Sequence, residues 1–537
     1  MGEKMSFKQK LQVKKESQFQ EMLKEQQQNQ KEQQELQEEL KEHFDEKFLM
    51  AKQNINAVEI PKLIQRRAQQ VFSKYHVKDI RDMGQNFINL YQKLHQGEKP
   101  QDYLTVDPFI SSFDIKKDLS SGANDYIYLR DSKLSKVEAD ALAEKKRQER
   151  VQKQKENREK TEKARQNSRQ DDEDIDELNI DNRFQQKEQT NEEIIRKQNQ
   201  ENPNQQLLKY NQNMAIAYLL RKLPGTYAVQ KRIINEIKKR LPEFQPTSFL
   251  DYGAGLGQSS HIINEYYPDL KKQILLEPST VMRKLGKHIT QDIENNLWVD
   301  NLARMATIPN TQSFDLILCS FVLEEVPSAY ARQLIIDTLW NKLSKNGILI
   351  FISPGSPMGS RFTHDVRNHI LNNKSESDPY IIAPCAHQGK CPLAQNKETW
   401  CHFEQKYYKY KKDVFPKKNT ENNYGTEKYS YVVIQKGKNF EFDIDNYEEI
   451  QQLETWQQSF SWNRILFPSI KKGGHIILNL CSNEGEYERR IITKSHKEFG
   501  PKGYKELKKL NWGDFWRFEK RIPNKFRKEG LRGKRLW

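Results

Sequence analysis

Four of the five cysteines in this 537-residue chain have a pattern that could bind metal. Three lie within seventeen residues with the spacing C-x5-C-x9-C, and the fourth follows 80 residues later; they are Cys385, Cys391, Cys401 and Cys481. Three thiolates from one loop and one from a distant strand can hold an iron–sulfur cluster or a structural zinc ion. The spacing lacks the close Cys-x2-4-Cys pairs of a zinc ribbon. Two histidines, His387 and His402, could replace a thiolate as zinc ligands.

Two other interpretations of these cysteines remain open. The pair Pro384-Cys385 is similar to the Pro-Cys pair of cytosine-5 RNA methyltransferases, which would make Cys385 a nucleophile. In those enzymes the pair follows the fourth strand, whereas here it lies about thirty residues after the apolar run ILIFISPG. The cysteines could also be unrelated loop residues, but three of five in so short a span favour metal or cluster ligation. Cys319 lies inside an apolar run and is expected to be a small core residue.

A second candidate site is the glycine-rich turn in FLDYGAGLGQSS. An apolar run ends at Asp251, and glycines follow at positions 253, 255 and 257. Glycine permits a tight turn and the close approach of a ligand at the carboxyl end of a strand. The nicotinamide fingerprint would need glycine at position 258, where this chain has Gln258. Glu277 ends the next apolar run, where a carboxylate can accept hydrogen bonds from both hydroxyls of a ribose.

The D-x-G-x-G-x-G pattern resembles the first motif of class I S-adenosylmethionine-dependent methyltransferases. In that family SFDLILCSFVLEEV would be the fourth strand, which lines the donor pocket. The resemblance implies six donor-binding residues: Asp251, Gly253, Gly255, Gly257, Glu277 and Ser320. No Asn/Asp-Pro-Pro-aromatic tetrapeptide, the usual grip on a target amine, follows that strand, and no general base identifies itself. The sequence therefore predicts a donor site and leaves the catalytic residues unknown.

Alternating short apolar runs and helical patterns must position both sites. Two amphipathic helices are expected before the glycine turn, split near Pro224-Gly225 and ending near Pro242. Strands and helices then alternate through QILLEPS, FDLILCSFVL, ARQLIIDTLWNKL and GILIFISPG, which predicts a doubly wound α/β sheet. Further strands are expected at YSYVVIQK and GHIILNLC, with YERRIITKS as a hairpin partner of the latter. The predicted fold is a class I (Rossmann-like) methyltransferase sheet with a helical N-terminal region and a cysteine-bearing insertion.

The chain divides into seven segments by composition. Residues 1–55 are a Gln/Glu/Lys-rich extension, helical or disordered; 56–135 are a helical region; and 136–204 are a charged helix with an acidic linker. Residues 205–355 form the methyltransferase-like core with its leading helices, and 356–428 the cysteine-rich insertion. Residues 429–500 supply the remaining strands of the sheet, and 501–537 are a basic, aromatic tail.

The tail contributes much of the chain's net charge of +15. From Pro501 to Trp537 there are thirteen Lys/Arg and four Asp/Glu, with seven aromatic residues interleaved. Cations that meet phosphates, beside rings that stack on bases, suit an RNA surface. The alternative is a solvated tail that keeps the protein soluble.

The overall composition excludes two classes of protein. No run approaches the roughly 18 apolar residues of a membrane helix, and five scattered cysteines do not form a secreted disulfide framework. A reducing or matrix-like compartment is therefore expected. The N-terminal MGEKMSFKQKLQVKK is basic and nearly free of acidic residues, which is compatible with import into an organelle. A mean hydropathy of −0.95 indicates that part of the chain is extended or disordered.

Taken in order, several motifs resemble one family over roughly residues 205 to 517. They are YNQNMAIAYLLRKLPGTYAV, FLDYGAGLGQSS, ISPGSPMGSRFTHDVRNHIL, APCAHQGKCPL, WCHFEQ, GHIILNLCSNEGEYERRIITKSH and WGDFW. This combination is similar to the mitochondrial methyltransferase-like proteins of the small ribosomal subunit, a family of assembly factors. The N-terminal third is not covered by the resemblance.

The resemblance implies a location, a cofactor and a function. It implies a protein of the mitochondrial matrix that binds small-subunit rRNA and ribosomal proteins, with no membrane or DNA partner. The four cysteines would hold a [4Fe–4S] cluster whose role is structural, and S-adenosylmethionine would be a possible ligand of the glycine turn. Little or no methyl transfer is expected. The alternatives are an active rRNA methyltransferase and a zinc or iron–sulfur module that binds proteins.

Overall fold

The computed structural model describes residues 46–96, 210–306, 313–326, 329–372, 378–394, 396, 398–416, 422–437, 450, 452–494 and 500–517. Most of the predicted N-terminal extension, the charged helix and the acidic linker therefore lie outside the described residues. The last twenty residues of the basic tail lie outside them as well.

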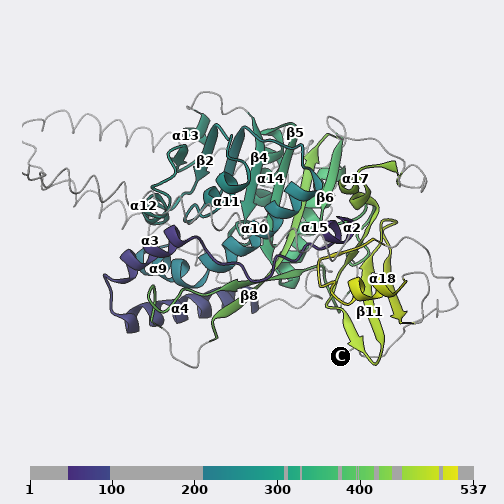
Figure 1. Ribbon diagram of the computed structural model, residues 1–537. Coiled ribbons are helices and arrows are strands. Elements are labelled where there is room, and N and C mark those ends of the chain that lie inside the picture. Colours follow the sequence, from purple (N-terminus) through teal and green to yellow (C-terminus); the bar gives the residue numbers. More distant parts are fainter. Residues whose placement is uncertain are drawn as a thin grey trace, which may run out of the picture. The chain divides into compact units, whose positions relative to one another are not determined.

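A sheet of eight strands forms the centre of the described fold (Figure 1). Its order is β3-β2-β1-β4-β5-β8-β6, with β7 paired to β8. Strands β1 to β5 are parallel, and β8 runs antiparallel to β5. This is the arrangement of a class I methyltransferase, so the predicted fold class is confirmed. The strands are β1 (Ser248–Tyr252), β2 (Lys272–Leu276), β3 (Asn296–Val299), β4 (Phe314–Ser320), β5 (Leu343–Pro354), β6 (Pro379–Ala383), β7 (Phe403–Tyr408) and β8 (Tyr424–Lys436).

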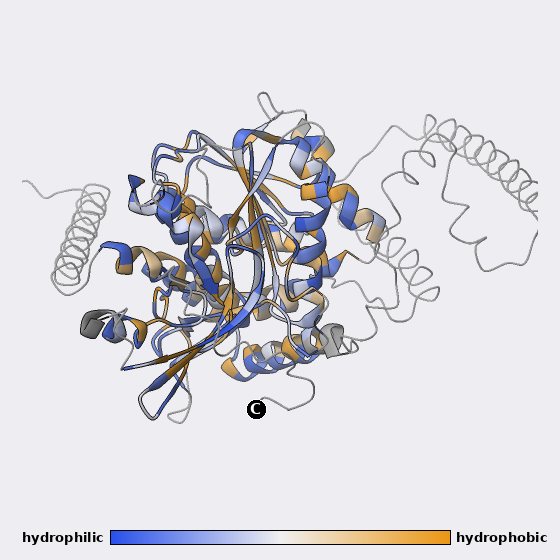
Figure 2. Ribbon diagram, turned by 90° about the vertical axis from the view of Figure 1, so that its right-hand side faces the viewer, coloured by the Kyte–Doolittle hydropathy of each residue, from blue (hydrophilic) through white to orange (hydrophobic). Residues whose placement is uncertain are grey.

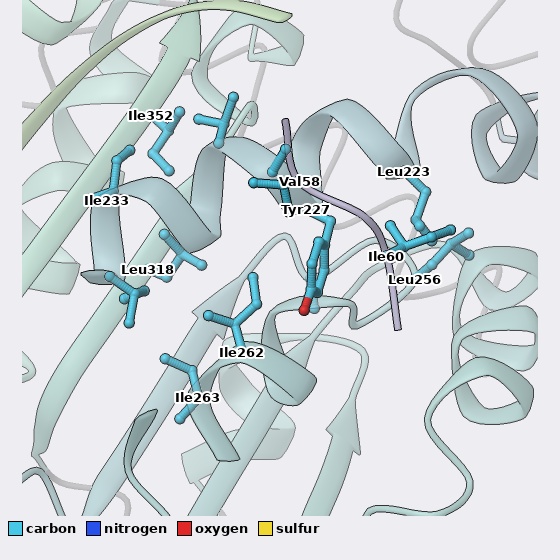
Figure 3. Packing of buried hydrophobic residues seen from close by; sticks show 14 of the residues in the cluster. Val58, Ile60, Leu223, Tyr227, Ile233, Leu256, Ile262, Ile263, Leu318 and Ile352 are labelled. Atoms are coloured by element: carbon cyan, nitrogen blue, oxygen red, sulfur yellow. The ribbon is translucent and has the colours of Figure 1, made fainter. Parts of the chain in front are cut away.

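Helices cover both faces of this sheet, because successive strand residues point to opposite sides. Phe249 packs in the core on the side of α10, whereas Leu250 packs with α14 and α15 on the other side. Figure 3 shows part of the first of these cores, including Tyr227 and Ile233 of α10 and Leu318 of β4. Cys319 belongs to the second of these cores and is 1% exposed, as expected for a small core residue. The helices are α9 (Gln212–Arg221), α10 (Leu223–Arg240), α11 (Ser259–Tyr266), α12 (Thr280–Ile289), α13 (Leu302–Ala306), α14 (Ala329–Asn341) and α15 (Pro357–Asn372).

The helix break before the glycine turn lies slightly earlier than predicted. It falls at Lys222, and Pro224 and Gly225 belong to the first turn of α10. Proline is tolerated there because the first helical N–H groups have no partner within the helix. Upstream, α2 (Glu46–Ala51), α3 (Lys62–Phe72) and α4 (Val77–Gln96) precede these helices, and both α3 and α4 pack against α9.

A second, five-stranded sheet follows in the chain, and it corrects one prediction. We expected residues 429–500 to complete the central sheet, but only β8 does so. The hairpin of β11 with β12 forms as predicted, in a separate sheet of order β10-β11-β9-β13, with β12 on the other edge of β11. Apolar alternation predicts a strand but does not name its partner, which explains the error. The strands are β9 (Asn463–Ile465), β10 (Ile470–Lys472), β11 (His475–Cys481), β12 (Tyr487–Thr493) and β13 (Phe515–Trp516).

The predicted basic tail begins inside this second sheet. Helix α18 (Gly500–Leu507) packs on it through Tyr504 and Leu507, and Phe515 and Trp516 are fully buried. Those aromatic residues are therefore core residues and not part of an exposed RNA surface, which corrects the prediction for residues 501–517.

The cysteine-rich insertion is also shorter than predicted. Helix α15 and strand β6 are ordinary parts of the central fold, and β8 already begins at Tyr424. The inserted stretch that carries three cysteines is residues 384–402, between β6 and β7. Figure 2 shows apolar colours concentrated in the strands of the centre, whereas the helices around them carry both hydrophilic and apolar residues. Along the described part of the chain, no helix combines the length and apolar character needed to cross a membrane.

Candidate functional site

Four cysteines from separate parts of the chain line one small cavity. Cys385 follows β6, Cys391 lies in the loop, Cys401 precedes β7, and Cys481 ends β11 of the second sheet. About 280 Å³ of space, part of it open to solvent, separates the lining atoms. The structure thus brings together all four predicted ligands. The other lining residues are Pro384, Pro392, Leu393, Phe403, Arg464 and Leu466.

The surroundings of these thiols favour their neutral form. Burial raises the pKa of Cys391 to about 11, and the neighbouring Cys385 adds to the rise. Burial also raises the pKa values of Cys401 and Cys481 well above normal, and the other thiols of the cavity contribute again. A coordinating metal would invert this balance, because a metal-bound thiol is deprotonated.

Two buried arginines hold the backbone around the cavity. Arg464 of β9 donates from Nε to the carbonyl of Pro384 at 2.8 Å, directly before the first cysteine. Arg367 of α15 donates to the carbonyls of His387 at 3.2 Å and Gly389 at 2.5 Å, between Cys385 and Cys391. Both guanidinium groups act to lower the pKa of Cys481. Hydrogen bonds from two guanidinium groups, one on the central fold and one on the second sheet, therefore hold the loop in place.

Neither predicted histidine lines the cavity. His387 is 5% exposed, and both of its ring nitrogens lack a hydrogen-bond partner within the described structure. His402 stacks on Trp400, and its Nδ1 lies 3.1 Å from the Trp400 carbonyl. Among the residues that the structure describes, no group of three or more His, Cys, Asp or Glu side chains is arranged to hold a metal ion. The site is a cavity that four thiols line and that neither histidine enters.

A buried ion network joins the central fold to the second sheet beside this cavity. Glu236 of α10 is fully buried and accepts from Arg464, from Arg232 at 2.9 Å and from the Tyr431 hydroxyl at 2.9 Å. Burial would raise the pKa of Glu236, but Arg464 and Arg232 outweigh it and lower the pKa to about 2. Arg464 also donates to the carbonyl of Gly513 at 2.7 Å. No local sequence pattern indicates this network, since Glu236 and Arg464 lie 228 residues apart in the chain.

The glycine turn has the backbone shape that its sequence predicts. Gly253, Gly255 and Gly257 have φ values of +76°, +57° and +70°, a region that favours glycine. A Cβ on Gly253 would lie 2.3 Å from Cγ2 of Val322, and one on Gly257 would lie 2.8 Å from the Trp298 ring. Two of the three glycines are therefore required by close packing as well as by φ.

The predicted donor-binding polar residues meet at the carboxyl ends of β1, β2 and β4. Glu277 accepts from the backbone N–H groups of Gly255 and Ser279, both at 2.9 Å, and burial raises its pKa. Asp251 is 1% exposed, and one of its oxygens accepts from the Ser259 hydroxyl. Within the described structure the other Asp251 oxygen and the Ser320 hydroxyl are buried without a partner. Burial raises the pKa of Asp251 to about 7.

Sequence reasoning missed two further acids at the same edge. Glu324 and Glu325 follow β4 in a short 3-10 turn (Leu323–Glu325), and burial raises their pKa values to about 7 and about 8. The Tyr210 hydroxyl donates to Glu325 at 2.6 Å. The paired glutamates in LEEV, directly after the fourth strand, were the available signal. Among the described residues, none is placed where it could be assigned as the general base of a methyl transfer.

The positive charge of Lys222 acts to lower the pKa values of both Glu324 and Glu325. Its Nζ lies 2.6 Å from Glu427 and stands over the rings of Tyr91 at 4.6 Å and Phe321 at 4.4 Å. Phe321 directly follows β4 and has a φ of +57°, which is rare for a bulky residue.

Comparison with known proteins gives a family match over most of the described chain. The family described as "Mitochondrial small ribosomal subunit Rsm22" matches residues 212–517. The human protein "Ribosome assembly protein METTL17, mitochondrial" is 25% identical over 321 residues, covering 58% of this chain and 64% of that protein. "Ribosome assembly protein RSM22, mitochondrial" of Saccharomyces cerevisiae is 21% identical over 405 residues, covering 53% and 64%. The chain thus spans less than two thirds of the length of these relatives.

Solved structures with a similar fold are methyltransferases at low identity. The precorrin-6y C5,15-methyltransferase of Geobacter metallireducens is 13% identical, with a TM-score of 0.25, and the match covers 39% of this chain and 87% of that one.

Proposed function

The chain belongs to the mitochondrial small ribosomal subunit Rsm22 family, and we propose that it is a mitochondrial ribosome assembly factor that binds small-subunit rRNA. The matched residues 212–517 contain both sheets, the glycine turn and all four cavity cysteines. Relatives in human and yeast are named as ribosome assembly proteins of mitochondria. The protein is mitochondrial, and the proposal assigns it to the matrix, with rRNA and ribosomal proteins as partners.

The proposal includes a [4Fe–4S] cluster held by Cys385, Cys391, Cys401 and Cys481. The donor set fits, because the cavity is lined by four thiols and by no carboxylate or imidazole. Cysteine thiolates are the usual ligands of such clusters, and zinc is the alternative for the same set. Arg367 and Arg464 supply positive charge next to a centre that thiolates make anionic. When bound, the cluster would act as a cross-link between the loop 384–402 and the second sheet.

S-adenosylmethionine is a second ligand that the residues fit. The methyl donor carries a sulfonium and an ammonium group, and the buried acids at the carboxyl ends of β1, β2 and β4 suit a cationic ligand. The unpartnered Asp251 oxygen and Ser320 hydroxyl are buried polar groups that a ligand would satisfy. In this proposal Asp251, Ser320, Glu277 and the glycine turn bind the donor. No methyl transfer is assigned, since no described residue has the position of a base or of a clamp on a target.

The cluster is tested by removing one thiol. We expect Cys391→Ala to lower the iron content, to bleach the brown colour of the protein purified without oxygen, and to abolish co-sedimentation with the small subunit. The matched control is Cys319→Ala, which removes a buried thiol that does not line the cavity. Far-UV circular dichroism should be unchanged in both variants. Normal iron content and normal co-sedimentation of Cys391→Ala would contradict the proposal.

A second candidate function is an active rRNA methyltransferase. It is favoured by the buried Asp251 oxygen and Ser320 hydroxyl without hydrogen-bond partners in the described part of the chain, which a bound methyl donor would satisfy. Mapping of small-subunit rRNA methylation in cells that carry Asp251→Ala or Glu277→Ala separates the two. Loss of a methyl group together with normal ribosome association would establish the enzyme; an unchanged methylation map supports the assembly factor.

A further inference from the structure

The second sheet has one covered face and one open face. Ile476, Leu478 and Leu480 of β11 pack with Tyr504 and Leu507 of α18. Residues of a strand alternate between faces, so His475, Ile477, Asn479 and Cys481 point away from α18. The burial of the strand follows this alternation, because His475 is exposed and Ile477 and Asn479 are half-buried. Cys481, at the end of the strand, is covered by the cysteine loop through Leu393.

Strand register extends the open face across three strands. Ile470 of β10 and Ile491 of β12 lie on either side of Ile477, and they are 47% and 50% exposed. Lys472 pairs with His475, and Arg489 pairs with Asn479. Tyr487 pairs with Cys481 and is 42% exposed. The open face thus begins at a ligand of the cysteine site and continues over the sheet.

The charge on this face has one sign. Its strand positions include the cations Lys472 and Arg489 and the ionisable His475, and they include no carboxylate. Glu488 pairs with Arg490 at 2.7 Å, and both belong to the other side of β12. Glu484 and Glu486 lie in the turn beyond the cysteine end and bound the face there.

One aromatic ring stands among these cations. Tyr487 donates to the amide oxygen of Asn479 at 3.0 Å, and the positive charge of Arg489 acts on it from the same strand. An exposed ring beside a guanidinium offers a base a stacking surface and its phosphate a counter-charge. The isoleucine row adds non-polar surface for the faces of bases and riboses.

We infer that the open face of the second sheet, centred on Tyr487 and Arg489, is a docking surface for single-stranded RNA. The inference rests on the proposed function and specifies where the rRNA is bound. The positive charge of the face favours an anionic partner, and the exposed Tyr487 ring beside Arg489, on which a base can stack, favours RNA over an acidic or apolar protein segment. Because Tyr487 pairs with Cys481, the cysteine site fixes one end of this surface, which would make RNA binding depend on the site.

The test measures binding of the full chain to a single-stranded RNA of about 20 nucleotides, longer than the footprint of one such surface, over a range of salt concentrations. Tyr487→Leu should weaken binding about tenfold, the scale of removing one base stack. The double change Lys472→Gln and Arg489→Gln should reduce the slope of log K against log salt by about 0.7 for each phosphate that is no longer neutralised. Lys284→Gln on α12 is the control, an exposed lysine on the central fold. It should change neither quantity by as much.

The outcomes distinguish failure of the inferred RNA surface from failure of the proposed function. If the unaltered protein binds no RNA, then rRNA binding itself is wrong. If it binds RNA and the variants of the open face match Lys284→Gln, the inference is overturned while the proposed function stands. Ile491→Ser tests the protein alternative: loss of ribosome association with unchanged RNA affinity would assign the face to a protein partner and overturn the inference.

Discussion

Glu236 offers the sharpest test of how the second sheet is held in place. Its carboxylate lies on α10 of the central fold and accepts from Arg464 of the second sheet, so the pair crosses between them. Glu236→Gln keeps the size of the side chain and removes its charge. Arg232 and Arg464 would then be buried cations without their carboxylate, which costs about 3–5 kcal/mol of unfolding free energy for a broken buried pair.

The pKa of Glu236 gives an independent magnitude. A folded-state pKa of about 2, against an ordinary value of 4.5, is a decrease of about 2.5. At about 1.36 kcal/mol for each unit of pKa, the charged carboxylate contributes roughly 3 kcal/mol. Because the folded pKa is the lower one, this contribution is complete above pH 4.5 and is lost as the pH falls from 4.5 toward 2. The two routes agree in size.

The assay is urea unfolding of Glu236→Gln and of the unaltered protein at pH 7 and at several values down to pH 3. At pH 7 the variant should be less stable by the amount given above, and the gap should close as the pH falls. Glu265→Gln is the control, since Glu265 forms an exposed pair with Lys231 and such pairs contribute about 0–1 kcal/mol. A gap at pH 7 no larger than that of Glu265→Gln, or a gap independent of pH, would refute the reasoning. The iron content of Glu236→Gln should also fall, because Arg464 holds the carbonyl before Cys385.

Two further predictions concern the candidate sites. Arg367→Gln removes the donor to two loop carbonyls between Cys385 and Cys391, so iron content should drop with little change in far-UV circular dichroism; a variant with full iron content would contradict this role. Asp251→Asn should raise the stability of the ligand-free protein at pH 8, because burial raises the Asp251 pKa from 3.8 to about 7 and charging the carboxyl in the fold costs free energy as the pH rises through that range. The gain should shrink toward pH 4, as thermal unfolding at the two pH values would show, and a gain that is equal at both would contradict it.

Local patterns predicted the elements of the fold well. The strand that ends at Asp251, the glycine turn and the strand that ends at Glu277 all lie where the sequence indicates. Each depends on residues that are close in sequence, so apolar runs and turn residues suffice to predict them. The division of strands between two sheets was not predicted, because β11 has the same alternation whichever sheet it joins.

The sequence predicted those site residues whose type is rare in this chain, and it missed those whose type is common. Four cysteines are rare enough to be noticed, and the structure brings them together. Glu236, Arg367 and Arg464 were missed because charged residues are common in this chain and their pairing is a property of the tertiary structure. Glu324 and Glu325 were missed for a related reason, since burial and not sequence raises their pKa values.

The arrangement of these contacts would let the proposed cluster control the proposed RNA binding without being needed for the fold. The second sheet is attached to the rest of the protein through Glu236 and Arg464, and also through Asp514, which accepts from the backbone of Gln53 at 2.7 Å and Asn54 at 2.9 Å. Neither attachment involves a cysteine, so the second sheet should stay in place when the four thiols bind no cluster. Cys481, however, lies at the end of β11 opposite Tyr487, and there the loop 384–402 is tied to the sheet through the cavity side chains and Arg464. Loss of the cluster should therefore loosen the loop and the Tyr487 end of the open face first, before either sheet unfolds.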